Sequence, residues 1–189
     1  MGRLVYSAIC SLDGYTNGVD GRFEWAAPDA AEHAAVNDLE RDVETYLYGR
    51  RMYEVMRFWD QPMAEDEDPV ALDYQRVWRG ADKVVYSSSL PEVTTPRTRL
   101  ERRFDVDAVR SEKEAASGRI SIGGPTLAAA ALAAGLVDDL WLLLLPLTVG
   151  GGTRALPDGL GLALDLQESR RFERGSVLLR YTVRPSPRG

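Results

Sequence analysis

The stretch RISIGGPTL, residues 119–127, contains a strand-like segment, a glycine pair and the start of a helix. Its first five residues are typical of a short strand. Two glycines then end the strand, and Pro125 begins an alanine-rich helix expected over 125–135, which Gly135 ends. Either the glycines form an ordinary tight turn, or the backbone there must approach something closely. The residues alone leave both interpretations open.

Strands and helices alternate on both sides of this stretch. Further strands are expected at 3–11, 45–49, 82–89, near 99–104 and at 139–149, and further helices after Pro28-Asp29 and at 50–59, 69–79 and 105–116. Alternation of this kind predicts an α/β fold of three layers, with a mostly parallel central sheet flanked by helices.

The chain is expected to close with an antiparallel hairpin. Residues 162–173 and 176–184 have the composition of paired strands around Arg174-Gly175. We therefore expect one domain over residues 1–184 and a frayed tail at 185–189.

Composition narrows the classes of function. The chain has 189 residues, of which 44% are hydrophobic and 28% charged, and its net charge of -6 argues against nucleic acid or an anionic membrane as partner. The lone Cys10 excludes an intramolecular disulfide, and no His/Cys/Asp cluster has metal-ligand spacing, so no metal site is predicted. The apolar run 140–149 is shorter than the roughly 20 residues of a membrane-spanning helix. A cytoplasmic protein without a signal peptide is the expectation.

The chemistry should lie where strands lead into loops and helices, because ligands of such sheets bind beyond the carboxyl ends of the strands. Four junctions qualify, at 11–17, 49–51, 87–89 and 123–126. Glycine lets the backbone approach a pyrophosphate, and arginine and serine side chains can bind further phosphates. A dinucleotide would span these junctions. Each motif alone is also compatible with a plain turn, helix start or loop.

The order of the motifs resembles the dihydrofolate reductase-like family, and in particular its branch related to the reductase domain of bacterial riboflavin biosynthesis. The resemblance runs from about residue 3 to 184 and is carried by the segments 11–14, 49–54, 85–88, 122–127 and 135–156. It implies a reductase that binds NADPH.

The resemblance also implies which residues contact the cofactor. The set is Ile9, Thr16, Gly49, Arg50, Arg51, Ser87, Ser88, Gly123, Gly124, Pro125, Thr126 and Leu127. The first two would flank the nicotinamide, and the Gly-Arg-Arg motif would lie near the adenosine phosphates, where arginine favours the 2′-phosphate of NADPH. The two serines would lie beside the adenosine half, and the last five residues would cradle the pyrophosphate.

Hydride transfer also needs an electron-poor C=N or C=O group and usually a proton source. The catalytic candidates are Asp13, which could instead form a turn with Gly14, and Asp29, which could instead cap the first helix. Dihydrofolate reductases place their carboxylate five residues after a tryptophan, whereas Asp29 follows Trp25 by four. One residue rotates a helical side chain by about 100°. Dihydrofolate is therefore not the expected substrate.

Three aromatic residues, Trp25, Tyr53 and Trp59, could stack on a flat heterocycle, with core packing as the alternative for Tyr53. His33 is expected on the exposed part of the first helix, without a catalytic role.

The sequence thus predicts a stand-alone NADPH-dependent reductase of a small pteridine-, pyrimidine- or flavin-like heterocycle. The alternatives are a non-catalytic NADPH-binding module and an authentic dihydrofolate reductase. The edge of the C-terminal hairpin predicts a homodimer.

Overall fold

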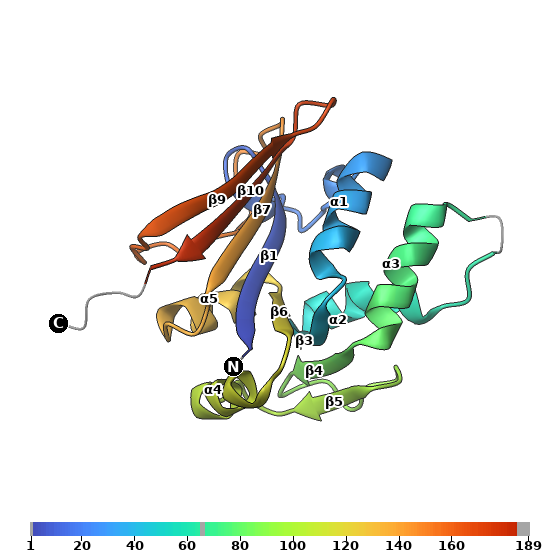
Figure 1. Cartoon of the computed structure of the whole chain (residues 1–189), viewed down its shortest axis with the longest axis vertical. Coiled ribbons are helices and arrows are strands. Elements are labelled where there is room, and N and C mark those ends of the chain that lie inside the picture. The colour runs from blue at the N-terminus through green and yellow to red at the C-terminus, as the bar shows by residue number, and fades with distance from the viewer. Residues whose placement is uncertain (1, 65–66, 185–189) are drawn as a thin grey trace. The chain divides into compact units, whose positions relative to one another are not determined.

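The strands of the protein form mostly parallel sheet flanked by helices, and two further short strands pair separately (Figure 1). The structure is a computed structural model that describes residues 2–64 and 67–184. It confirms the predicted α/β fold class with its C-terminal antiparallel hairpin. The predicted fraying of 185–189 lies outside the described residues.

The chain divides into two compact units. Unit 1 comprises Gly2 and Pro28–Gly124, and unit 2 comprises Arg3–Ala27 and the described residues from Pro125 onward. The single domain over 1–184 stays a prediction.

Unit 1 holds four parallel strands in the order β5-β4-β3-β6. Its elements are α1 (Ala30–Glu40), β3 (Val43–Gly49), α2 (Arg50–Met56), the 3₁₀ turn η2 (Arg57–Asp60), α3 (Pro69–Gly80), β4 (Asp82–Tyr86), β5 (Thr98–Glu101), α4 (Val106–Ala115) and β6 (Arg119–Gly123). The strand predicted over 82–89 ends at Tyr86, because the Ser87 hydroxyl accepts hydrogen bonds from the amides of Ser89 and Leu90 and bends the chain.

A buried polar network joins β3 to α1 and α3 in the core of unit 1. The carboxylate of Glu40 is 6% exposed and accepts hydrogen bonds from the hydroxyls of Tyr46, at 3.0 Å, and Tyr74, at 2.9 Å. Burial raises the pKa of Glu40. The indole of Trp78 donates to the hydroxyl of Tyr48 at 3.2 Å. The polar groups of these core residues thus have partners inside the protein.

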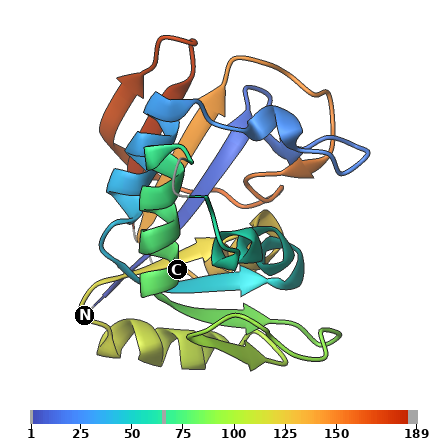
Figure 2. The same cartoon turned by 90° about the vertical axis from the view of Figure 1, so that its right-hand side faces the viewer.

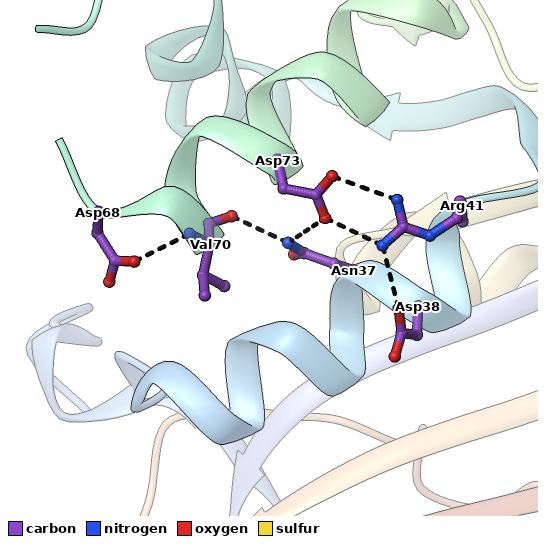
Figure 3. Close-up of polar contacts among 6 residues, drawn as sticks. All are labelled: Asn37, Asp38, Arg41, Asp68, Val70 and Asp73. Carbon is purple, nitrogen blue, oxygen red and sulfur yellow. Dashed lines mark hydrogen bonds and ion pairs between the residues drawn. The ribbon is translucent and has the colours of Figure 1, made fainter. Parts of the chain in front are cut away.

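Helices α1 and α3 lie side by side in both views (Figures 1 and 2). The buried Asn37 amide donates to the carbonyl of Val70 at 2.9 Å and to Asp73 at 3.1 Å, and Arg41 pairs with both oxygens of Asp73 (Figure 3). The bond from Arg41 is the main reason that the pKa of Asp73 lies below its usual value. Polar contacts therefore fix α1 on α3.

The expected exposure of His33 is wrong. Its ring centroid lies 5.7 Å from that of Trp59 and 5.5 Å from that of Tyr74, and the side chain is half-buried. Burial lowers the pKa of His33. The histidine therefore packs against aromatic rings.

Unit 2 holds strands in the order β1-β7-β10-β9, of which β1 and β7 are parallel and the others antiparallel. Its elements are β1 (Arg3–Ser11), β2 (Tyr15–Asn17), the 3₁₀ turn η1 (Glu24–Ala26), α5 (Pro125–Ala133), β7 (Asp139–Leu145), β8 (Thr153–Arg154), β9 (Leu164–Arg171) and β10 (Val177–Val183). The short β2–β8 pair was not predicted, because strands of two or three residues carry no recognisable period.

The strand expected over 139–149 ends at Leu145, just before Pro146, which has no backbone N–H to donate. Most of β7 is buried, as its leucine-rich sequence predicts. Within the residues described, no helix has the length and apolar character needed to span a membrane.

Candidate functional site

Three of the predicted junctions follow neighbouring strands at one edge of the unit 1 sheet. In the register of the parallel strands, Gly49 of β3 lies opposite Tyr86 of β4, the residue before Ser87, and Tyr48 of β3 lies opposite Gly123 of β6. The segments 49–51, 87–89 and 123–124 therefore follow the carboxyl ends of adjacent strands, as expected.

Arg50 and Arg51 begin α2 at this edge, and both are exposed. Arg50 donates to Ser89 Oγ at 3.2 Å and pairs with Glu54 at 2.7 Å. The hydroxyl of the predicted Ser87 is instead used in its own turn. The serine that binds Arg50 is thus Ser89. Its position as the third serine of the 87–89 triplet is the one sequence feature that could have indicated it.

The two glycines after β6 have a local explanation. A Cβ on Gly123 would lie 2.9 Å from the ring of Tyr48 and 3.3 Å from the methyl of Met52. Gly124 has a φ of 91°, a left-handed conformation that glycine adopts without steric cost. The backbone therefore does approach something closely, namely side chains of β3 and α2. A phosphate is not needed to explain the glycines.

Unit 2 carries a hollow of about 500 Å³ beside the first turn of α5. Pro125 and Thr126, two of the predicted cofactor residues, line it together with Tyr15 and residues 152–154. Thr126 is exposed, so its hydroxyl is accessible. Neither of the predicted catalytic residues, Asp13 and Asp29, lines this hollow.

The other cofactor residues predicted in unit 2 are half-buried. Thr16 donates to the carbonyl of Thr153 at 3.2 Å, which ties β2 to β8. Ile9 lies on β1 and Leu127 on α5. Neither of these two residues lines the hollow.

The second glycine cluster, 150–152, is held against the loop that follows β1. Both carboxylate oxygens of Asp13 accept backbone hydrogen bonds, from Val149 at 3.2 Å and from Gly150 at 2.8 Å. A Cβ on Gly152 would lie only 1.8 Å from the carbonyl oxygen of Asn17. The glycines thus allow two loop backbones to touch.

The two predicted catalytic carboxylates have structural partners. The hydrogen bond from Ser11 and those from Gly150 and Val149 lower the pKa of Asp13. Asp29 is the N-cap of α1, where it accepts from the amide of Glu32 at 2.9 Å. The capping interpretation of Asp29 is therefore confirmed.

The predicted stacking residues differ in exposure. Tyr53 is 1% exposed, and its hydroxyl accepts from the amides of Thr94 and Thr95, so its ring packs in the core, which is the alternative expected for it. Trp59 is partly buried, with its ring centroid 4.8 Å from that of Tyr74. Trp25 is half-buried in η1.

The RibD C-terminal domain matches residues 3–178, which is nearly the whole chain. The chain belongs to this family. The membership confirms the resemblance drawn from the junction motifs. No curated protein matches the chain significantly.

Solved structures share the fold of this RibD C-terminal domain at low sequence identity. A putative riboflavin biosynthesis protein from Shewanella sp. PV-4 superposes with a TM-score of 0.75 at 17% identity, covering 97% of this chain and 99% of that one. A pyrimidine reductase-like protein from Corynebacterium diphtheriae superposes with a TM-score of 0.68 at 14% identity, covering 97% of this chain and 92% of that one. Dihydrofolate reductase from Enterococcus faecalis, complexed with NADP(H) and RAB-propyl, superposes with a TM-score of 0.64 at 16% identity, covering 97% of each chain.

Proposed function

We propose that this RibD C-terminal domain is an NADPH-dependent reductase that transfers hydride to a small heterocycle of the pteridine, pyrimidine or flavin type. Membership of the family over nearly the whole chain carries the proposal. The likeness of its fold to a reductase complexed with NADP(H) supports it.

In unit 1, Arg50 and Arg51 are the proposed ligands of the 2′-phosphate of NADPH. A guanidinium stays charged at all physiological pH values and presents parallel N–H donors that match phosphate oxygens. Glu54 and Ser89 already orient Arg50, which reduces the entropy lost when it binds an anion. Gly49 would lie near the adenosine phosphates as well, and Ser87 and Ser88 would lie beside the adenosine half.

The glycine–helix junction is the proposed pyrophosphate cradle. Amide groups in the first turn of α5 have no partner within the helix and favour anions. Thr126 can add its exposed hydroxyl. In this proposal Gly123, Gly124, Pro125 and Leu127 contribute backbone contacts or shape, and Ile9 and Thr16 flank the nicotinamide.

On the substrate side, Asp13 and Asp29 would hold backbone segments in place through their carboxylates. Asp13 would fix the 149–150 backbone at the end of β1, and Asp29 would set the start of α1. Trp25 and Trp59 remain the proposed stacking residues.

Titration of the purified protein with NADPH and NADH, followed by nicotinamide fluorescence, tests the cofactor. The double variant Arg50→Gln/Arg51→Gln should weaken NADPH binding about 10- to 100-fold, since hydrogen bonds between charged groups contribute about 1.5–3 kcal/mol each, and should change NADH binding little. Arg57→Gln, an exposed arginine of η2, is the matched control. Equal losses for both nucleotides would contradict the 2′-phosphate role, and no binding of either would refute the proposed cofactor.

A substrate panel distinguishes the two alternatives. Oxidation of NADPH with a pterin, an aminopyrimidine or a flavin would exclude a non-catalytic NADPH-binding module. Fast turnover of dihydrofolate alone would instead identify an authentic dihydrofolate reductase, against our expectation.

A homodimer formed through the exposed edge strand β9 is part of the proposal, because an unpaired strand edge is a template for pairing. Light scattering that gives the monomer mass would refute it. A cytoplasmic location also stays a prediction.

A further inference from the structure

Arg154 is the one positively charged residue among those that line the hollow of unit 2 in the described structure. It lies on β8, opposite Tyr15 of β2 in the register of the short antiparallel pair. Pro125 and Thr126, from the proposed pyrophosphate cradle, line the same hollow. Neither the sequence motifs nor the proposed function assigns Arg154 a role.

Two side chains contact the guanidinium of Arg154. Its central carbon lies 5.0 Å from the centroid of the Tyr15 ring, within the range of a cation–π contact. Its Nε lies 3.0 Å from a carboxylate oxygen of Asp158. Within the described residues, neither Nη group of Arg154 donates a hydrogen bond to a protein acceptor, and its ion pair with Asp158 is made closest at Nε.

The contact with Asp158 does not prevent Arg154 from binding an anion. The Asp158 side chain is 83% exposed and that of Arg154 is 47% exposed. Ion pairs between exposed side chains contribute little to stability, so an arriving anion can share or replace the carboxylate. The ring of Tyr15 would still hold the plane of the guanidinium.

We propose that Arg154 is a further cofactor ligand, which donates its Nη hydrogens to the diphosphate bridge of the dinucleotide from the wall of the hollow formed by β2 and β8. This inference rests on the proposed function. The diphosphate is the matching group because the residues proposed to cradle it line the same hollow. Arg154 thereby contacts a group that NADPH and NADH share, whereas Arg50 and Arg51 contact the 2′-phosphate that only NADPH has.

This difference defines the experiment. We expect Arg154→Gln to weaken NADPH and NADH binding by the same factor, about tenfold, since bonds to a charged group contribute about 1.5–3 kcal/mol and this side chain is half-exposed. Arg154→Lys, which keeps the charge but loses the forked donors, should fall between the wild type and Arg154→Gln. Arg174→Gln, an exposed arginine between β9 and β10, is the matched control and should bind as the wild type does.

A variant of the neighbouring acid gives a second measurement that does not depend on removing Arg154. Asp158→Asn removes the competing carboxylate and should leave both affinities unchanged or raise them about twofold, the scale of one exposed ion pair. Weaker binding by Asp158→Asn would overturn the inference.

The outcomes separate the two proposals. If the wild type binds neither nucleotide, the proposed function fails, and the inference fails with it. If the wild type binds both and Arg154→Gln, still folded by circular dichroism, binds as the Arg174→Gln control does, only the inference is overturned. A loss confined to NADPH would also overturn it, because Arg154 would then contact the 2′-phosphate.

Discussion

The two units of this protein differ in the kinds of side chain that their cores contain. The core of unit 1 holds tyrosine hydroxyls and charged groups, among them Glu40 and the 2% exposed Lys83, whose ammonium donates to the carbonyls of Trp78 and Ala81. Burial lowers the pKa of Lys83 to about 8. The core of unit 2 is built on the leucine-rich strand β7. At its surface, the loop at Gly152 approaches the loop at Asn17 so closely that a Cβ on Gly152 would lie 1.8 Å from the carbonyl oxygen of Asn17.

The difference shows two ways in which the stability of a folded unit can depend on single residues. In unit 1, buried groups such as Glu40 and Lys83 depend on hydrogen-bond partners, because an unsatisfied buried group costs about 1–3 kcal/mol. In unit 2, the loops after β1 and β7 depend on the absence of a side chain. Unit 1 should therefore respond most to changes of charge or pH, and unit 2 to added volume.

The largest effect is expected for Gly152→Ala. The new Cβ would lie 1.8 Å from the carbonyl oxygen of Asn17, and the φ of 132° is strained for any other residue. Combining strained backbone with an overpacked contact predicts a loss of about 3–5 kcal/mol in unfolding free energy. In a chain of this size, that corresponds to a fall in Tm of roughly 10 °C.

Gly161→Ala is the control, since its Cβ would meet no atom within 4 Å. Differential scanning calorimetry measures both variants. Equal melting temperatures for the two would contradict the close backbone contact.

A smaller, pH-dependent effect is expected for Glu40→Gln in unit 1. Because the folded pKa of Glu40 is raised, its contribution to stability is present below the unfolded pKa of about 4.3 and is lost as pH rises through the folded pKa. The neutral glutamine does not titrate. The variant should therefore gain stability relative to the wild type as pH rises above about 4.3.

Urea denaturation at three pH values in that range measures this difference. Glu92→Gln, an exposed glutamate, should show no such trend. A difference between Glu40→Gln and the wild type that stays constant with pH would exclude a raised pKa for Glu40.

The smallest effect is expected for Asp13→Asn in unit 2. The pKa of Asp13 is lowered by Ser11, Gly150 and Val149, so its contribution is present above the unfolded pKa and is lost as pH falls through the folded value. Asparagine keeps one carbonyl acceptor for the loop amides. A slight fall in Tm at pH 7, which shrinks toward pH 3, is expected from thermal denaturation, with Glu173→Gln as the exposed control. A fall in Tm of the same size at both pH values would show that the charge of Asp13 does not matter.

Much of the fold was predictable because its signals are local. Residues 119–127 predicted the strand, the turn and the helix start where β6 and α5 lie, and the alternation of strands and helices predicted the rest of the sheet. The hairpin β9–β10 was likewise marked by its turn residues. Pairing of β2 with β8 was not, because strands so short show no pattern.

The candidate site was predictable in part. Parallel strands place their carboxyl ends at one edge of the sheet. The sequence therefore predicts that the junctions at Arg50, at the serine triplet and at Gly123 lie at that edge. It could not show that Arg50 meets Ser89, that Tyr53 is buried, or that His33 packs against Trp59. Each of these depends on contacts between residues far apart in the chain.

The family, the order of the elements and the edge where the junctions lie follow from local pattern and chain order, so the sequence predicts them. The reason for the glycines becomes visible only in the folded protein. Gly123 makes room for Tyr48 and Met52, and Gly152 makes room for the backbone at Asn17. The atoms that require a glycine belong to distant residues, so a local pattern can mark the glycine without revealing its reason.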